Sequence, residues 1–145
     1  MKILLQTRKI RGLRTISYYL MKVLGLEIPK SVKIGKNVSF EHWGYGVVLH
    51  PNTIIEDNVK IYQGVTTGRG DIYTSFENSQ MDKIIIKESA ILCAGSKIIC
   101  KSGILVVDKG TIIGANAVLL SSTGINEVWG GIPAKKLKSR GKLIS

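Results

Sequence analysis

The chain of 145 residues contains two histidines, His42 and His50, and histidine is the side chain best suited to exchange a proton near neutral pH. His42 stands between Glu41 and Trp43 in the segment EHWGYG, where a carboxylate, an imidazole and aromatic rings are close in sequence. This neighbourhood indicates a reactive site, and a structural surface histidine is the alternative interpretation. His50, in the segment LHPN, is interpreted as structural or peripheral.

Two histidines are too few for the three-histidine site that metal-dependent solenoid enzymes of the carbonic anhydrase kind use, so no metal is expected. The two cysteines, Cys93 and Cys100, lie in apolar stretches. We expect them to be reduced, buried or half-buried thiols of a cytoplasmic protein, because no feature of the sequence around them would activate a thiolate.

The net charge of +11 is concentrated at the two ends of the chain. Residues 1–22 hold six basic and no acidic side chains, residues 135–145 hold five basic and no acidic ones, and the stretch between holds ten of each. A nucleic-acid-binding sheet would place charge and stacking aromatics on the body of the fold, so nucleic acid is not expected as a partner. The N-terminal apolar run is too short for a signal peptide, and no run of about 18 apolar residues predicts a membrane span.

Aliphatic side chains recur every six residues in blocks. This period differs from the helical period of about 3.6 and the strand period of about 2, and it is typical of a coil of three short strands that repeats as a solenoid. A small or β-branched residue four positions later fits the tight corner; a β-sandwich with chance spacing is the alternative. The aliphatic series is Ile28, Ile34, Phe40, Leu49, Ile55, Ile61, Thr67, Ile86, Leu92, Ile98, Val107, Ile113 and Leu119, and the small series is Val38, Thr53, Val59, Val65, Ala90, Ser96, Ser102, Thr111 and Ala117.

Breaks in the hexads predict where loops leave the coil. We expect an all-β solenoid over residues 27–122 with a loop at 68–83, preceded by a helical cap over residues 1–26 and followed by a basic C-terminal tail over residues 123–145. The cap is expected to cover the first coil with one apolar face, made of Ile10, Leu13, Ile16, Leu20, Val23 and Leu24.

The segments IGKNV, EHWGYGVVLHPNTIIEDNVKIYQGVT, IGANAVLL and GIPAK together resemble the hexapeptide-repeat acyltransferases. The resemblance is to the serine O-acetyltransferase-like branch with its polysaccharide and sugar O-acetyltransferase relatives, and it covers about residues 27 to 136. It implies a left-handed parallel β-helix, a homotrimer, and acetyl-CoA bound as cosubstrate between neighbouring subunits. It also implies direct transfer of the acetyl group to an acceptor hydroxyl.

The resemblance implies the catalytic roles as well. His42 would be the general base that removes the proton of the acceptor hydroxyl. Glu27 would orient that imidazole by accepting its N–H, with a solvent-facing charge as the alternative. Glu41 matches an aspartate that contacts the acceptor in the serine enzymes, and it would hold an acceptor hydroxyl or amine, with a solvated charge as the alternative.

For the cofactor, the resemblance points to main-chain groups of Gly68, Arg69 and Gly70 and to the small residues Ala94 and Ala115, along which the pantetheine arm would lie. Lys135 and Lys136 would supply cations for the nucleotide phosphates, and a solubilising tail is the competing interpretation.

Departures from the serine enzymes favour a different acceptor. Trp43 and Tyr45 add flat faces that suit a sugar ring, and Gln80, Met81 and Asp82 stand where the serine enzymes carry a second histidine. We therefore expect O-acetylation of a sugar or polysaccharide precursor, with L-serine as the alternative acceptor. A non-catalytic scaffold, docked on an anionic membrane by the basic N-terminal helix, is the alternative outside enzymes. The expected location is the cytoplasm, with peripheral contact at the inner face of the membrane.

Overall fold

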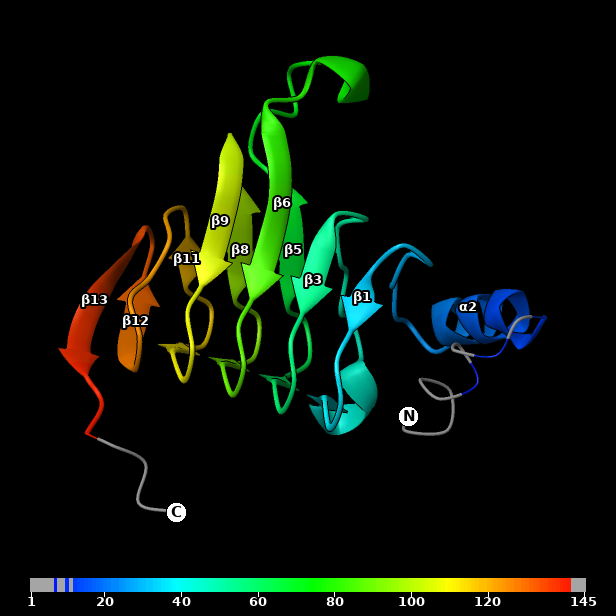
Figure 1. The fold of residues 1–145 in the computed structure, drawn as a ribbon, viewed down its shortest axis with the longest axis horizontal. Helices are drawn as coiled ribbons and strands as arrows, with labels where there is room; N and C mark the ends of the chain where they lie inside the picture. Colours follow the sequence, from blue (N-terminus) through cyan, green and yellow to red (C-terminus); the bar gives the residue numbers. More distant parts are fainter. Residues whose placement is uncertain (1–6, 8–9, 11, 142–145) are drawn as a thin grey trace.

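The computed structural model describes residues 7, 10 and 12–141, in which the chain winds into a three-sided solenoid of short parallel strands (Figure 1). Each full turn contributes strands to three sheets, and equivalent strands of successive turns pair in parallel. The hexad pattern therefore predicts the class of fold correctly.

The three sheets differ in size. The four-stranded sheet contains β1 (Lys33–Ile34), β3 (Thr53–Ile55), β6 (Met81–Ile86) and β9 (Gly103–Val107). The six-stranded sheet contains β2 (Ser39–Phe40), β4 (Lys60–Ile61), β7 (Ile91–Leu92), β10 (Ile112–Ile113), β12 (Glu127–Gly131) and β13 (Ala134–Ser139). The three-stranded sheet contains β5 (Thr66–Arg69), β8 (Lys97–Cys100) and β11 (Val118–Leu119), and single bridges through Val48 extend it to Glu27. The helical elements are α2 (Leu13–Val23) and the single turns η1 (Glu41–Gly44) and η2 (Phe76–Asn78).

The aliphatic residue of each hexad lies on the solenoid axis. Ile55, Ile86 and Val107 are in register on neighbouring strands and are buried, and the other expected positions are buried as well, except Ile34, which is partly buried. Of the small residues expected at corners, Ser102 differs because it is exposed. Burial of one aliphatic side chain per hexad supplies the main stabilisation, of about 1.5–3 kcal/mol for each fully buried side chain.

Two corners of the solenoid are built from residues in left-handed backbone conformation. One column holds Gly25, Gly46, Gly64, Gly95 and Asn116, and the other holds Asn37, Asn58, Ser89, Gly110 and Asn126. At Gly64, a Cβ atom would stand 3.5 Å from the Cα of Gly95 on the next turn, so the first column is closely stacked. Glycine and asparagine adopt these angles at the lowest cost, which explains their recurrence at the corners.

The apolar face of the N-terminal segment is exposed, so the expectation that it covers the first coil is wrong. Its six side chains are between 39% and 83% exposed. Helix α2 contacts the solenoid through the neighbouring edge, where Ser17 and Met21 are buried one turn apart. Docking that edge turns the apolar face outward. Residues 1–6, 8–9 and 11 of the expected cap lie outside the described residues.

In the described ranges, no helix combines the length and the apolar character that a membrane crossing requires.

The C-terminal residues differ from the expected tail, because they form a hairpin of β12 and β13. Strand β12 pairs in parallel with β10, and β13 pairs antiparallel with β12. The open edge of β10 at the last complete turn explains this: β12 satisfies its backbone groups, and the Trp129 side chain packs against the core. Residues 142–145 lie outside the described residues.

Candidate active site

His42 lies at the corner between the six-stranded and three-stranded sheets, which we call the histidine corner. The backbone is left-handed at three successive residues, His42 (φ 50°), Trp43 (φ 61°) and Gly44 (φ 67°). Such a conformation costs a non-glycine residue about 1–3 kcal/mol and is concentrated at functional sites. The His42 side chain is exposed, with its ring centroid 6.1 Å from that of Tyr62 on the next turn.

The shape of the corner is fixed from below by close packing. Gly44 is buried, and a Cβ atom there would stand 2.7 Å from Leu26 Cδ2 and 3.2 Å from Phe40 Cβ. The N–H of Tyr45 donates to the His42 carbonyl at 3.3 Å, and the N–H of Val47 donates to the Gly44 carbonyl at 3.0 Å. These contacts hold the backbone that presents the imidazole to solvent.

The side chains beside His42 are polar and aromatic. Glu41 accepts a hydrogen bond from Ser39 Oγ at 2.7 Å, which leaves its second oxygen for a ligand. Trp43 and Tyr45 are largely exposed. The structure adds Tyr62, which sequence reasoning missed: it follows β4 and lies beside the histidine ring only because one turn of the solenoid stacks on the next.

Glu27 does not contact His42 in any interaction seen among the described residues. Its carboxylate pairs with Lys22 Nζ at 3.7 Å, and both side chains are about half exposed. The backbone of Glu27 is paired with Val48, which follows the histidine corner along the chain, whereas His42 lies within that corner. An orienting role for Glu27 would require its side chain to exchange Lys22 for the imidazole.

The expected pantetheine-binding residues share the histidine corner. Backbone hydrogen bonds of 2.9 Å join successive turns at this corner. The N–H of Gly64 donates to the Tyr45 carbonyl, that of Gly95 to the Gln63 carbonyl, and that of Asn116 to the Ala94 carbonyl. The corner column is therefore Tyr45, Gln63, Ala94 and Ala115. Ala94 is half-buried and Ala115 is exposed, so small side chains leave the outer surface of this column open.

The C-terminal hairpin carries the two lysines expected to bind the nucleotide phosphates. Lys135 is exposed and pairs through its backbone with Gly130, and no contact among the described residues engages its ammonium group. Lys136 Nζ instead binds Glu127 Oε1 at 2.7 Å. The hydrogen bond from Lys136, together with those from Trp129 Nε1 and Gly124 N–H, lowers the pKa of Glu127 to about 2. Of the two expected phosphate ligands, Lys135 is the available one.

The other expected cofactor residues lie at the following corner, where β5 ends. Gly68 and Arg69 are paired with β8, and the N–H of Gly70 donates to the Cys100 carbonyl at 2.7 Å. The length of β5 separates this corner, which we call the loop corner, from the histidine corner. A single chain thus does not bring the two sets of expected cofactor residues together.

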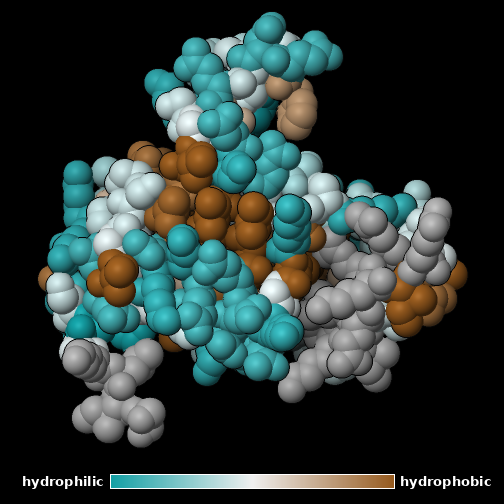
Figure 2. All heavy atoms as spheres, viewed as in Figure 1, coloured by the Kyte–Doolittle hydropathy of each residue, from teal (hydrophilic) through white to brown (hydrophobic). Residues whose placement is uncertain are grey.

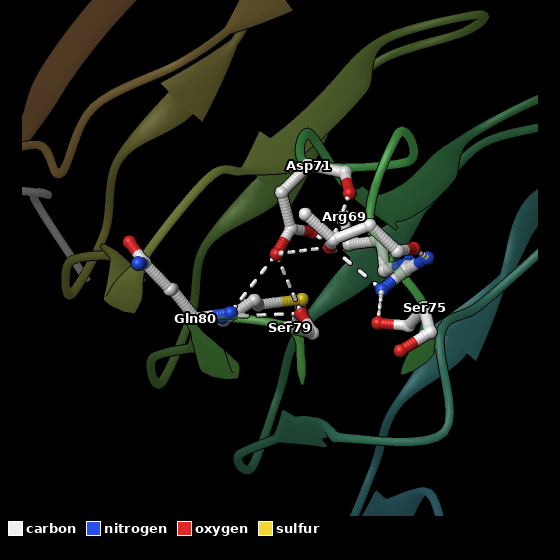
Figure 3. Close-up of polar contacts among 7 residues, drawn as sticks. Arg69, Asp71, Ser75, Ser79 and Gln80 are labelled. Carbon is white, nitrogen blue, oxygen red and sulfur yellow. Dashed lines mark hydrogen bonds and ion pairs between the residues drawn. The ribbon is translucent and has the colours of Figure 1, made fainter. Parts of the chain in front are cut away.

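The loop that leaves the loop corner is tied at its base by Asp71 (Figure 3). The buried Asp71 carboxylate accepts hydrogen bonds from Ser79 Oγ at 2.8 Å and from the N–H of Gln80 at 2.9 Å, which joins the two ends of the loop. Burial alone would raise the pKa of Asp71, but these hydrogen bonds and the nearby Arg69 lower it overall. Arg69 also donates to the carbonyls of Thr74 at 2.6 Å and Ser75 at 3.2 Å.

The second histidine contributes to the same loop. The His50 ring stacks on Phe76 at 6.0 Å with an angle of 21°, and the Arg69 guanidinium lies 5.7 Å from the Phe76 ring centroid. Burial, and then the charge of Arg69, lower the pKa of His50, which favours its neutral imidazole. Contacts across a loop do not follow from the spacing of residues in the sequence, so the sequence did not predict the roles of Asp71 and Phe76 in holding this loop.

The described residues hold no cluster of three or more histidine, cysteine, aspartate or glutamate side chains arranged for a metal ion. Cys93 is half-buried, Cys100 is buried, and burial raises the pKa of both thiols.

Several curated serine acetyltransferases are similar to this chain over almost its whole length. One from Staphylococcus epidermidis is 36% identical over 141 residues, which cover 97% of this chain and 62% of the relative. One from Staphylococcus aureus is 34% identical over 134 residues, which cover 92% of this chain and 59% of the relative. The chain thus spans about three fifths of the length of these curated relatives. No family model matches the chain.

Solved serine acetyltransferases share the fold. The enzyme from Brucella abortus in complex with coenzyme A is 26% identical with a TM-score of 0.74, over 90% of this chain and 50% of that chain. The enzyme from Vibrio cholerae is 28% identical with a TM-score of 0.75, over 94% of this chain and 49% of that chain. The likeness confirms the left-handed β-helix implied by the resemblance.

These relatives support the resemblance to hexapeptide-repeat acyltransferases of the serine acetyltransferase kind and do not indicate the polysaccharide and sugar branch. The expectation of a sugar or polysaccharide acceptor is therefore wrong: the curated relatives at 34% to 36% identity are named for serine. The exposed rings of Trp43 and Tyr45 suit a flat ligand but do not specify a sugar, which is why they misled the sequence interpretation.

Proposed function

We propose that this chain is a serine O-acetyltransferase, which transfers the acetyl group of acetyl-CoA to the hydroxyl of L-serine. The observation that carries the proposal is the 36% identity to a curated serine acetyltransferase over 97% of this chain. The geometry of the histidine corner supports it, because an exposed imidazole on a strained, well-packed turn suits a group that must meet two substrates.

In this proposal His42 is the general base. Its neutral imidazole accepts the proton of the serine hydroxyl as the oxygen attacks the thioester carbon, and a tetrahedral intermediate forms. Collapse of the intermediate breaks the carbon–sulfur bond, and the imidazolium returns the proton to the departing CoA thiolate. Glu27 orients the imidazole once its carboxylate leaves Lys22, and so stabilises the imidazolium.

The remaining expected residues take binding roles. Glu41, whose first oxygen is held by Ser39, directs its free oxygen to the ammonium group of serine, beside Trp43 and Tyr45. The pantetheine arm follows Ala94 and Ala115 along the histidine corner. Lys135 contacts the nucleotide phosphates, and Lys136 contributes less because Glu127 holds it.

We further propose a homotrimer, because a single chain leaves the expected cofactor residues divided. The histidine corner carries His42, Ala94 and Ala115, and the loop corner, one strand away, carries Gly68 and Gly70. A neighbouring copy that sets its loop corner against the histidine corner of the first would complete the cofactor cleft. Light scattering of the purified chain tests this, with three times the 15.9 kDa chain mass as the expected result.

The reaction is tested by incubating the purified chain with acetyl-CoA and a panel of acceptors, with products identified by mass spectrometry. The panel contains L-serine, D-serine, L-threonine and a set of nucleotide sugars. We expect O-acetyl-L-serine as the main product. Acetylation of a sugar without L-serine turnover would contradict the proposal, and absence of turnover with bound acetyl-CoA would favour a non-catalytic scaffold.

A further inference from the structure

Helix α2 presents a broad apolar surface that no described part of the chain covers. This surface, the α2 apolar face, includes Ile16 at 63%, Tyr19 at 61% and Val23 at 83% exposure, together with Ile10, Leu13, Leu20 and Leu24. The positions within α2, which are Leu13, Ile16, Tyr19, Leu20 and Val23, recur at helical spacing, so these side chains share one side of the helix. Figure 2 shows apolar side chains at the surface over this end of the molecule. Continuous exposed apolar surface of this kind marks an interaction site.

The helix is held in place by a different edge, so the α2 apolar face is free to meet a partner without unfolding. Met21 and Ser17 are buried, and Ser17 Oγ lies 2.7 Å from Thr7 Oγ1. Lys30, from the first coil, donates to Thr15 Oγ1 at 2.8 Å. The solenoid therefore serves as a rigid support behind the helix (Figure 1).

Positive charge borders the α2 apolar face. Lys22 Nζ lies 5.3 Å and Lys30 Nζ 5.7 Å from the ring centroid of Tyr18, on the flank of the helix next to Tyr19. The first 24 residues of the chain contain six basic side chains and no acidic one. Apolar side chains and a tyrosine on one helix, with cations at its flank, are the combination that binds the headgroup region of an anionic bilayer.

We propose that the α2 apolar face docks the protein on an anionic phospholipid surface, with the helix lying in the plane of the headgroups. A second copy of the chain fits this face less well, because residues 1–24 hold six basic side chains and no acidic one, so two copies would bring sequences of like charge together. The α2 apolar face contains none of the residues proposed for acetyl transfer, although Lys22 at its border pairs with Glu27 at 3.7 Å.

The proposal is tested by flotation of the full chain with vesicles of phosphatidylcholine containing phosphatidylglycerol, and with pure phosphatidylcholine vesicles, at low and high salt. The variant Ile16→Glu/Val23→Glu places charge in the α2 apolar face. The control Ile125→Glu/Ile132→Glu changes two residues that are 61% and 75% exposed at the other end of the solenoid. Thermal unfolding of each variant establishes that it is folded.

We expect wild type and the control to float with anionic vesicles, more weakly at high salt, and the α2 variant to lose at least about tenfold in partition coefficient. Failure of wild type to float, equal flotation of the α2 variant, or equal binding to pure phosphatidylcholine would overturn the proposal. A fall in oligomer mass of the α2 variant, measured by light scattering, would assign the face to a second copy instead.

Discussion

At the scale of single residues, the backbone angles of the histidine corner determine where the imidazole lies. His42 and Trp43 adopt left-handed angles that glycine tolerates better, and Gly44 continues the turn over the buried side chains of Leu26 and Phe40. The cost of these angles is offset by the packing beneath them. Changes at Gly44 therefore test whether the corner positions His42 without altering the imidazole itself.

Replacement of Gly44 by alanine is expected to lower both stability and activity. The added methyl group meets Leu26 Cδ2 at 2.7 Å and Phe40 Cβ at 3.2 Å, and φ is +67°. We expect a loss of roughly 1–3 kcal/mol in the free energy of unfolding, measured by urea denaturation, and a fall in kcat for acetyl transfer. The control Gly141→Ala meets nothing within 4 Å. Wild-type stability and kcat in the Gly44 variant would show that the corner is not constrained.

At the scale of elements, the C-terminal hairpin closes the end of the solenoid through one carboxylate. Glu127 binds Lys136 on β13 and the indole N–H of Trp129 on β12. The hairpin also sets the position of Lys135, which the proposed cofactor site uses. The ionisation of Glu127 is therefore coupled to the integrity of the hairpin.

The stability of the protein is expected to fall in acid because of Glu127. Its pKa is about 2 in the folded chain against an ordinary value of 4.5, so its contribution is complete above about pH 4.5 and is lost as the pH falls toward 2. The variant Glu127→Gln should have a lower Tm at pH 7 and a smaller decline of Tm between those two pH values. An unchanged decline would assign the acid sensitivity to other groups.

At the scale of the whole molecule, the hexads predict the solenoid because the packing of one aliphatic side chain per hexad repeats along the axis. The same patterns fail at the two ends. An apolar stripe on α2 indicates an amphipathic helix but does not show which side of the helix packs against the solenoid. The side that does so carries Ser17 and Met21. The charges and glycines after residue 122 were interpreted as a tail, although the open edge of β10 recruits β12.

The candidate site is likewise only partly readable from the sequence. His42 and its neighbours are adjacent along the chain, so their type and order predict a shared corner. Tyr62 and Asp71 gain their neighbours from stacking of turns and closure of a loop, which local spacing does not encode. The acceptor depends on the shape of a cleft that neighbouring copies are proposed to complete, and exposed rings alone led to the wrong substrate class.

The rate of O-acetyl-L-serine formation shows whether His42 acts in acetyl transfer. The rate is compared at saturating acetyl-CoA in wild type, His42→Ala and the control His50→Ala. We expect at least a hundredfold loss of kcat in His42→Ala, in line with the roughly 10²–10⁴ that a general base supplies, while His50→Ala keeps most of the activity. A folded His42→Ala protein that forms O-acetyl-L-serine at the wild-type rate would show that His42 is not the general base.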